Sequence, residues 1–113
     1  MKLISATIQP HMRGKVIGAL HELPHFPGVT ILKCQGQGRG KGQGGSYVVT
    51  EDDLQYNVKE RLEIICADDM VEAMVSTIVK NAHTGNFGDG IITICEVMDI
   101  IRIRTGERGE TVL

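Results

Sequence analysis

Six glycines within ten residues, GQGRGKGQGG at 36–45, divide this chain into two halves. Glycine loses more backbone entropy than any other residue when it becomes ordered, so a packed helix or strand does not tolerate such a density. The polar stretch continues past the glycines to about Asn57. We therefore expect one long loop over about residues 36–58, and a loop of this length inside a small domain is usually functional.

The half before the loop predicts a strand, a helix and a second strand. Residues 2–8 alternate between apolar and polar side chains, which is typical of a half-buried strand, and Pro10 ends it. Apolar residues then follow a helical period over residues 12–23, where Pro24 stops the helix. A second strand is expected over about residues 29–34.

The half after the loop repeats this order. Residues 61–66 alternate as a third strand. Asp69 is the expected N-cap of a second helix, with Glu72 reaching back to it in a capping box, and residues 70–79 carry the apolar stripe of that helix. The apolar run over residues 91–97 predicts a fourth strand, which a charged, alternating end follows.

The resulting order, β-α-β-loop-β-α-β, predicts an α+β fold, a ferredoxin-like βαββαβ sandwich. With 113 residues the chain has room for a single domain, residues 1–113. Both helices of such a sandwich cover one face of the sheet and leave the other bare. A bare apolar sheet face in so small a protein is normally buried by oligomerisation.

Charge and composition exclude several classes of protein. A net charge of −2 gives nucleic acid or an anionic membrane surface little to attract. No apolar run approaches the roughly 20 residues of a membrane span, and no signal peptide is recognisable, so we expect a cytoplasmic protein without direct membrane insertion. Cys34, Cys66 and Cys95 are odd in number and never spaced C-x-x-C, which predicts buried free thiols and no disulfide framework or zinc knuckle.

Arg102 and Arg104 lie two residues apart in the alternating end of the chain. On a strand both side chains leave the same face, and two adjacent guanidinium groups form a clamp for a polyphosphate because each can bind bidentately. The alternative interpretation is a solvated edge on which Glu107 is the partner of an arginine.

Three glycines precede the fourth strand. Gly85, Gly88 and Gly90 let backbone N–H groups approach an anion without an intervening Cβ, as in an anion-binding nest. Gly85 also lies just past the second helix, where a left-handed residue is favoured. Asp89 is expected to hold the loop rather than the ligand. The alternative is a plain turn between helix and strand.

Other chemistries have less support in the sequence. An RGG-like nucleic-acid segment needs a basic field and stacking aromatic residues, whereas the long loop becomes acidic and offers only Tyr47 and Tyr56. Pro24 separates His21 from His25, so their spacing does not predict a metal site on a helix. No Ser-His-Asp or Cys-His spacing indicates a catalytic residue, and we therefore expect a protein that is not an enzyme.

Three segments resemble a known family. Residues Thr84–Glu107, TGNFGDGIITICEVMDIIRIRTGE, are similar to the signature of the PII nitrogen-regulatory signal-transduction proteins, and residues Gly28–Gly42 resemble the second strand and the glycine-rich start of that family's T-loop. The spacing from there to residues 59–63, KERLE, also matches. The resemblance covers essentially the whole chain, with one extra residue near Pro24–Pro27. It implies a homotrimer with three clefts between subunits, each holding ATP or ADP. It also implies a T-loop that docks on a regulated transporter or enzyme and responds to the nucleotide and, in many members, to 2-oxoglutarate.

The resemblance also implies a set of nucleotide-binding residues. Thr30 matches the position whose hydroxyl reads the adenine, the start of the T-loop matches a segment that passes over the phosphates, and Lys59 matches the far end of that loop. The arginine pair and the glycine loop match phosphate-binding positions. The full set is Thr30, Gly36, Gly38, Arg39, Lys41, Lys59, Gly85, Gly88, Asp89, Gly90, Arg102 and Arg104.

The chain departs from the family at several positions. Ile91 stands where members usually carry a lysine that reaches the phosphates, and Gly40 stands where a glutamine coordinates the magnesium ion beside 2-oxoglutarate. Asp52 replaces the tyrosine that is uridylylated in the family. We therefore expect a divergent PII-like regulator that binds adenine nucleotide and binds 2-oxoglutarate with magnesium weakly or not at all. The alternative is a trimeric structural or metal-associated adaptor that has lost nucleotide binding.

Overall fold

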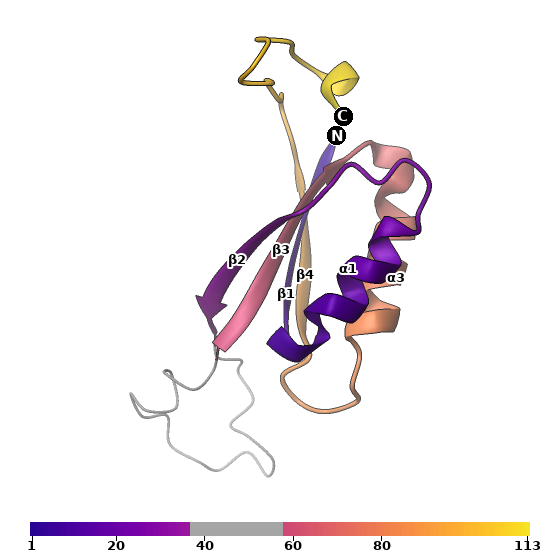
Figure 1. The fold of residues 1–113 in the computed structure, drawn as a ribbon, viewed down its shortest axis with the longest axis vertical. Helices are drawn as coiled ribbons and strands as arrows, with labels where there is room; N and C mark the ends of the chain where they lie inside the picture. The colour runs from indigo at the N-terminus through magenta and orange to yellow at the C-terminus, as the bar shows by residue number, and fades with distance from the viewer. Residues whose placement is uncertain (37–57) are drawn as a thin grey trace.

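A four-stranded antiparallel sheet, covered on one face by two helices, forms the body of the protein (Figure 1). The computed structural model describes residues 1–36 and 58–113. The strand order is β2-β3-β1-β4, so the expected ferredoxin-like α+β fold is confirmed. The elements are β1 (Lys2–Ile8), α1 (Arg13–His21), β2 (Thr30–Gln35), β3 (Val58–Cys66), α3 (Val71–Ala82) and β4 (Gly90–Glu96).

The core lies between the sheet and the helices. On β1 the alternate residues Ile4, Ala6 and Ile8 are buried, which confirms the face predicted from their spacing. Their partners in register on β3 include Ile64 and Leu62, which are also buried. Each large apolar side chain buried in this way contributes roughly 1.5–3 kcal/mol. The helices complete this core with Val16, Leu20, Met74 and Ile78.

The expected start of the second helix is wrong in detail. Residues Asp68–Met70 form a single 3-10 turn, in which the N–H of Met70 donates to the carbonyl of Ala67. Met70 is therefore the N-cap of α3, and no side chain caps the helix. The capping box of Asp69 and Glu72 does not form, because Asp69 already lies inside the turn that leads into the helix.

The first helix is shorter than its sequence pattern. A 3-10 turn, Pro10–Met12, precedes α1, and the helix ends at His21, before Pro24. The N–H groups of Glu22 and Leu23 still donate to carbonyls of the last turn of the helix, at 3.2 and 3.1 Å. The apolar period thus continues past the helix because Leu23 packs against the core from this terminal turn.

The opposite face of the sheet is bare, as expected, but it is not uniformly apolar. Directly opposed residues of antiparallel strands share a face, so the register gives the rows of this surface. The central row is polar and consists of Thr93, Ser5, Glu63 and Thr30. Towards the loop between α3 and β4, the next row consists of Ile91, Thr7, Arg61 and Leu32.

One charged side chain lies inside the helix-covered face. Glu60 of β3 is only 5 % exposed, and its Oε1 accepts a hydrogen bond of 3.0 Å from Nη1 of Arg13 at the start of α1. Within the described part of the chain, its Oε2 has no hydrogen-bond partner. A buried carboxylate with a single cationic partner depends strongly on that partner.

Removal of that partner provides a test of the packing. We expect Arg13→Leu to lower the free energy of unfolding by about 1–3 kcal/mol, because it leaves a buried charged group without its hydrogen bond. The double change Arg13→Leu with Glu60→Leu should recover most of this loss, since an apolar pair needs no compensating charge. Urea unfolding followed by circular dichroism measures both values. A single variant as stable as the unmodified protein would contradict the pairing.

Candidate functional site

The site residues predicted from the sequence gather at two opposite ends of the sheet. At the end nearest the loop between α3 and β4 lies a hollow of about 370 Å³, whose lining includes the predicted residues Gly36, Lys59, Gly88 and Gly90. At the end nearest the chain termini lies one of about 290 Å³, whose lining includes Thr30. The other described members of the predicted set line neither hollow, namely Gly85, Asp89, Arg102 and Arg104. The loop-end hollow is lined by Thr7, Cys34, Gln35, Gly36, Lys59, Arg61, Gly88, Gly90 and Ile91. The terminus-end hollow is lined by Leu3, Pro27, Gly28, Val29, Thr30, Glu63, Ile65, Ile100, Val112 and Leu113. Gly38, Arg39 and Lys41 lie outside the described residues.

Asp89 holds the loop between α3 and β4 in shape, which confirms its expected structural role. Its carboxylate accepts hydrogen bonds from the backbone N–H groups of Thr84 and Gly85, at 2.8 and 3.1 Å, and from the Thr84 hydroxyl. The Thr84 hydroxyl and these amides lower the pKa of Asp89. The N–H of Gly85 is therefore committed to Asp89, and it is Gly88 and Gly90 that line the loop-end hollow.

The three glycines of this loop have positive φ angles, which glycine adopts without steric cost. Gly85, Gly88 and Gly90 have φ angles of +86°, +93° and +107°. Gly90 has no alternative, because a Cβ atom there would lie 1.7 Å from the carbonyl oxygen of Thr7. Gly85, however, is not the helix cap that we expected. The cap is His83 in an extended conformation, and Gly85 lies two residues further on.

Two side chains tie the glycine loop to the sheet. Nζ of Lys59 donates to the carbonyl of Gly88 at 3.1 Å, and Nε2 of Gln9 donates to the same oxygen at 2.7 Å. Lys59 thus lies at the loop-end hollow. Sequence reasoning missed Gln9 and Arg61. Arg61 could have been found, since it lies two residues from Lys59 on one strand and so shares its face.

The expected strand over residues 101–104 is wrong. Ile101 forms an isolated bridge with Arg108, and the chain turns between them, with Gly106 at a φ of +74° and its N–H on the carbonyl of Arg102. Arg102 and Arg104 therefore do not share a strand face. Nη1 of Arg102 contacts Glu107 at 3.1 Å, which is the partner that the alternative interpretation named, and its Nη2 donates to the carbonyl of Val112 at 3.0 Å.

Arg102 is nevertheless linked to the terminus-end hollow through Val112. Val112, which Arg102 binds through its carbonyl, lines the same hollow as Thr30. Glu63, which sequence reasoning did not select, lies opposite Thr30 in the register and lines this hollow as well. The terminus end thus combines a hydroxyl, a carboxylate and a nearby guanidinium group.

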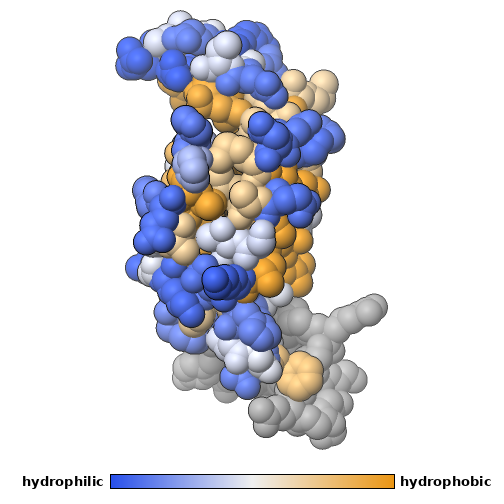
Figure 2. Space-filling model, turned by 90° about the vertical axis from the view of Figure 1, so that its right-hand side faces the viewer, coloured by the Kyte–Doolittle hydropathy of each residue, from blue (hydrophilic) through white to orange (hydrophobic). Residues whose placement is uncertain are grey.

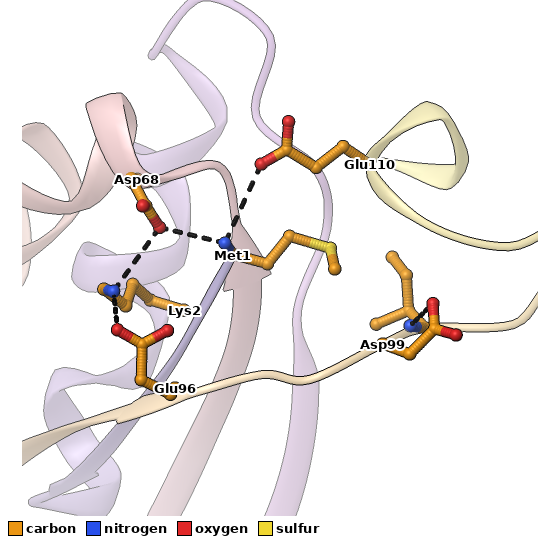
Figure 3. A network of polar contacts seen from close by, with 7 residues as sticks. Met1, Lys2, Asp68, Glu96, Asp99 and Glu110 are labelled. Atoms are coloured by element: carbon orange, nitrogen blue, oxygen red, sulfur yellow. Dashed lines mark hydrogen bonds and ion pairs between the residues drawn. The ribbon is translucent and has the colours of Figure 1, made fainter.

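A network of ion pairs fastens the C-terminal segment to β1 (Figure 3). The α-amino group of Met1 lies 2.9 Å from Asp68 and 3.7 Å from Glu110, and Lys2 binds Glu96 and lies 3.6 Å from Asp68. The hydrogen bond between the Met1 amine and Asp68 raises the pKa of the amine and lowers the pKa of the Asp68 carboxyl. The network thereby holds the turn that carries Arg102 beside the sheet.

The histidines and cysteines do not assemble in the described part of the chain. No three or more His, Cys, Asp or Glu side chains are arranged there to hold a metal ion. His83 contacts Asp89 at 3.5 Å, and the ring of His21 lies edge-on to Phe26. Cys66 is buried, which raises the pKa of its thiol, whereas Cys34 is half-buried and Cys95 is exposed. The expectation of buried thiols therefore fails for Cys95.

Comparison with known proteins gives one consistent result. The family model described as Nitrogen regulatory protein P-II matches residues 1–107. Nitrogen regulatory protein P-II of Azospirillum brasilense is 38 % identical over 109 residues, 96 % of each chain. P-II of Klebsiella oxytoca and P-II 1 of Escherichia coli strain K12 are each 38 % identical over 113 residues, 100 % of each chain. Within residues 1–36 and 58–113, no helix has the length and apolar character of a membrane span.

The terminal network predicts a specific pH dependence of stability. The raised pKa of the Met1 amine makes its contribution complete below its ordinary value of 8.0 and lost at higher pH. The lowered pKa of Asp68 makes its contribution present above 3.8 and lost as the pH falls further. We expect Asp68→Asn to lower the melting temperature most between these two limits, measured by circular dichroism. Asp69→Asn is the control, and an equal effect of both changes at every pH would contradict the network.

Proposed function

The chain belongs to the nitrogen regulatory protein P-II family, and on that premise we propose that it is a signal-transducing regulator rather than an enzyme. It assembles as a homotrimer and binds adenine nucleotide, ATP or ADP, between its subunits. It regulates a transporter or an enzyme in the cytoplasm through the loop at residues 36–58.

The observation that carries this proposal is the separation of the two half-sites. The Ile8 end of β1 pairs with Gly90, whereas its Lys2 end pairs with Glu96. The six residue steps between these ends span about 20 Å. Arg102 at one end and the glycine loop at the other are therefore too far apart to hold the same phosphate group within one subunit. A complete site needs the loop end of one copy and the terminus end of another.

This requirement also favours a closed ring of subunits. A contact between different ends of two identical chains is head-to-tail, and it uses every half-site only if the arrangement closes. Apolar side chains are available for such contacts, since Ile91 is 71 % exposed, Met98 99 % and Ile103 100 %. On the helix-covered side, hydrophobic residues gather along one margin between hydrophilic ends (Figure 2). The resemblance to PII proteins implies that the ring has three subunits.

Each half-site supplies different chemistry to the nucleotide. Thr30 and Glu63 offer a hydroxyl and a carboxylate to the adenine edge, and Arg102 and Arg104 bring guanidinium groups to the phosphates. From the neighbouring subunit, Gly88 and Gly90 offer backbone N–H groups. 2-Oxoglutarate with magnesium binds weakly or not at all, because Gly40 has no side-chain oxygen for an octahedral ion.

A second candidate function rests on two observations at the same positions. Ile91 presents an apolar side chain to the loop-end hollow, and Glu107 already neutralises part of the charge of Arg102. Both features weaken a phosphate site. They favour a trimeric structural or metal-associated adaptor that has lost nucleotide binding.

Calorimetric titration with ATP, ADP and AMP decides between the two candidates. We expect at least one of these nucleotides to bind, and the double change Arg102→Ala with Arg104→Ala to abolish binding. The control is Lys80→Ala on α3, away from both hollows, which should bind as the unmodified protein does. Sedimentation should give the mass of a trimer for all three proteins. If no nucleotide binds at millimolar concentration while the mass remains that of a trimer, the adaptor is correct.

A further inference from the structure

Arg61 has no role in the nucleotide site proposed above, although it lines the loop-end hollow. It faces Thr7 in the register between β3 and β1, and Thr7 in turn faces Ile91 of β4. The three side chains therefore form one row on the bare face of the sheet, with the small Thr7 in the middle. All three line the loop-end hollow.

The charge of this hollow comes from β3. Lys59 and Arg61, two residues apart on that strand, point to the same face and are the cations of the lining. The described residues that line the hollow include no Asp or Glu. Anions are attracted to such a surface, and the backbone amides of the glycine loop add to the attraction.

The two cations are not equivalent. The ammonium group of Lys59 already donates to the carbonyl of Gly88 and so helps to fix the glycine loop. Arg61 is exposed, and it makes no ion pair or hydrogen bond with the other described residues. Its guanidinium group presents donors in a planar fork, which matches two oxygens of a phosphate group.

Ile91 leaves one part of this row without a cation, and Arg61 lies close enough to supply one there. Adjacent strands lie about 4.8 Å apart, so the two backbone positions are separated by about 10 Å across Thr7. An arginine side chain carries its charge at the end of a long stem, which can extend over a small neighbour such as threonine. Arg61 can thus bring a cation to the part of the row where Ile91 supplies none.

We propose that Arg61 is the phosphate-binding cation of the loop-end hollow and contacts the terminal phosphate groups of a nucleoside di- or triphosphate. This proposal rests on the nucleotide binding proposed above. Arg61 determines specificity for the length of the phosphate chain, because the adenine lies at the other half-site and only the distal phosphates reach the loop end.

Calorimetric titration of Arg61→Met tests this proposal. We expect the affinity for ATP to fall about ten- to a hundredfold, as for the loss of one charge-assisted contact, and the affinity for AMP to change less than about threefold. Lys33→Met is the matched control, because Lys33 pairs with Glu60 in the register and so lies on the opposite, helix-covered face at the same end of the sheet. This control should bind ATP as the unmodified protein does.

Two further measurements separate the possible explanations. Ile91→Lys, added to Arg61→Met, should restore most of the ATP affinity if a cation anywhere on this row is sufficient. Inorganic tripolyphosphate, which has no nucleoside, should bind the unmodified protein and bind Arg61→Met at least tenfold more weakly. If tripolyphosphate binds in this way while ATP does not bind at all, the proposed nucleotide function fails and the role of Arg61 stands.

Three results would overturn the role of Arg61. The first is an Arg61→Met variant that binds ATP as the unmodified protein does. The second is a variant that sediments as a smaller species, which would make Arg61 part of a subunit contact instead. The third is an unmodified protein that binds neither ATP nor tripolyphosphate.

Discussion

The pairing of β1 in the centre of the sheet determines most of what this molecule can do. β1 lies between β3 and β4, and its register with both strands decides which residues face the helices and which remain on the bare face. Burial of Ile4, Ala6 and Ile8 fixes this register, because a slip of one residue would turn all three towards solvent. The same register places Gly90 at one end of the sheet and Glu96 at the other. It therefore also sets the distance between the two half-sites.

The proposed function depends on the distance between these two ends. The glycine loop, shaped by Asp89 and tied to the sheet by Lys59, presents amides at one end. The C-terminal turn, fastened through Met1 to Asp68, presents Arg102 at the other. Each end is held firmly by its own contacts, yet neither resembles a complete site. In the proposed trimer the contact between subunits joins them, so that nucleotide binding and assembly depend on the same surfaces and a bound nucleotide can report on the state of the whole ring.

The sequence predicted the features that depend on local periodicity or on the conformational needs of single residues. The two-residue alternation of β1 and β3, the helical stripe of α3 and the loop-holding role of Asp89 are of this kind. Features that depend on competing local geometries were predicted wrongly. Asp69 could cap a helix, but a 3-10 turn begins one residue earlier, and the alternation of residues 101–104 is that of a strand, although Gly106 turns the chain. The shared strand face of Lys59 and Arg61 could have been inferred from their spacing. The position of Arg61 beside Thr7 and Ile91 could not, because only the register reveals it.

The most direct test of a site shared between subunits is complementation in mixed oligomers. One chain carries Arg102→Ala with Arg104→Ala, and the other carries Lys59→Ala with Arg61→Met, so that each destroys a different half-site. Oligomers that contain both chains, isolated through two different affinity tags, are titrated with ATP. If the site is shared between subunits, neither variant binds alone and each mixed trimer regains a single intact site, with an affinity close to that of the unmodified protein. Mixed trimers that bind no more ATP than either variant alone, while the unmodified protein binds it, would contradict the account.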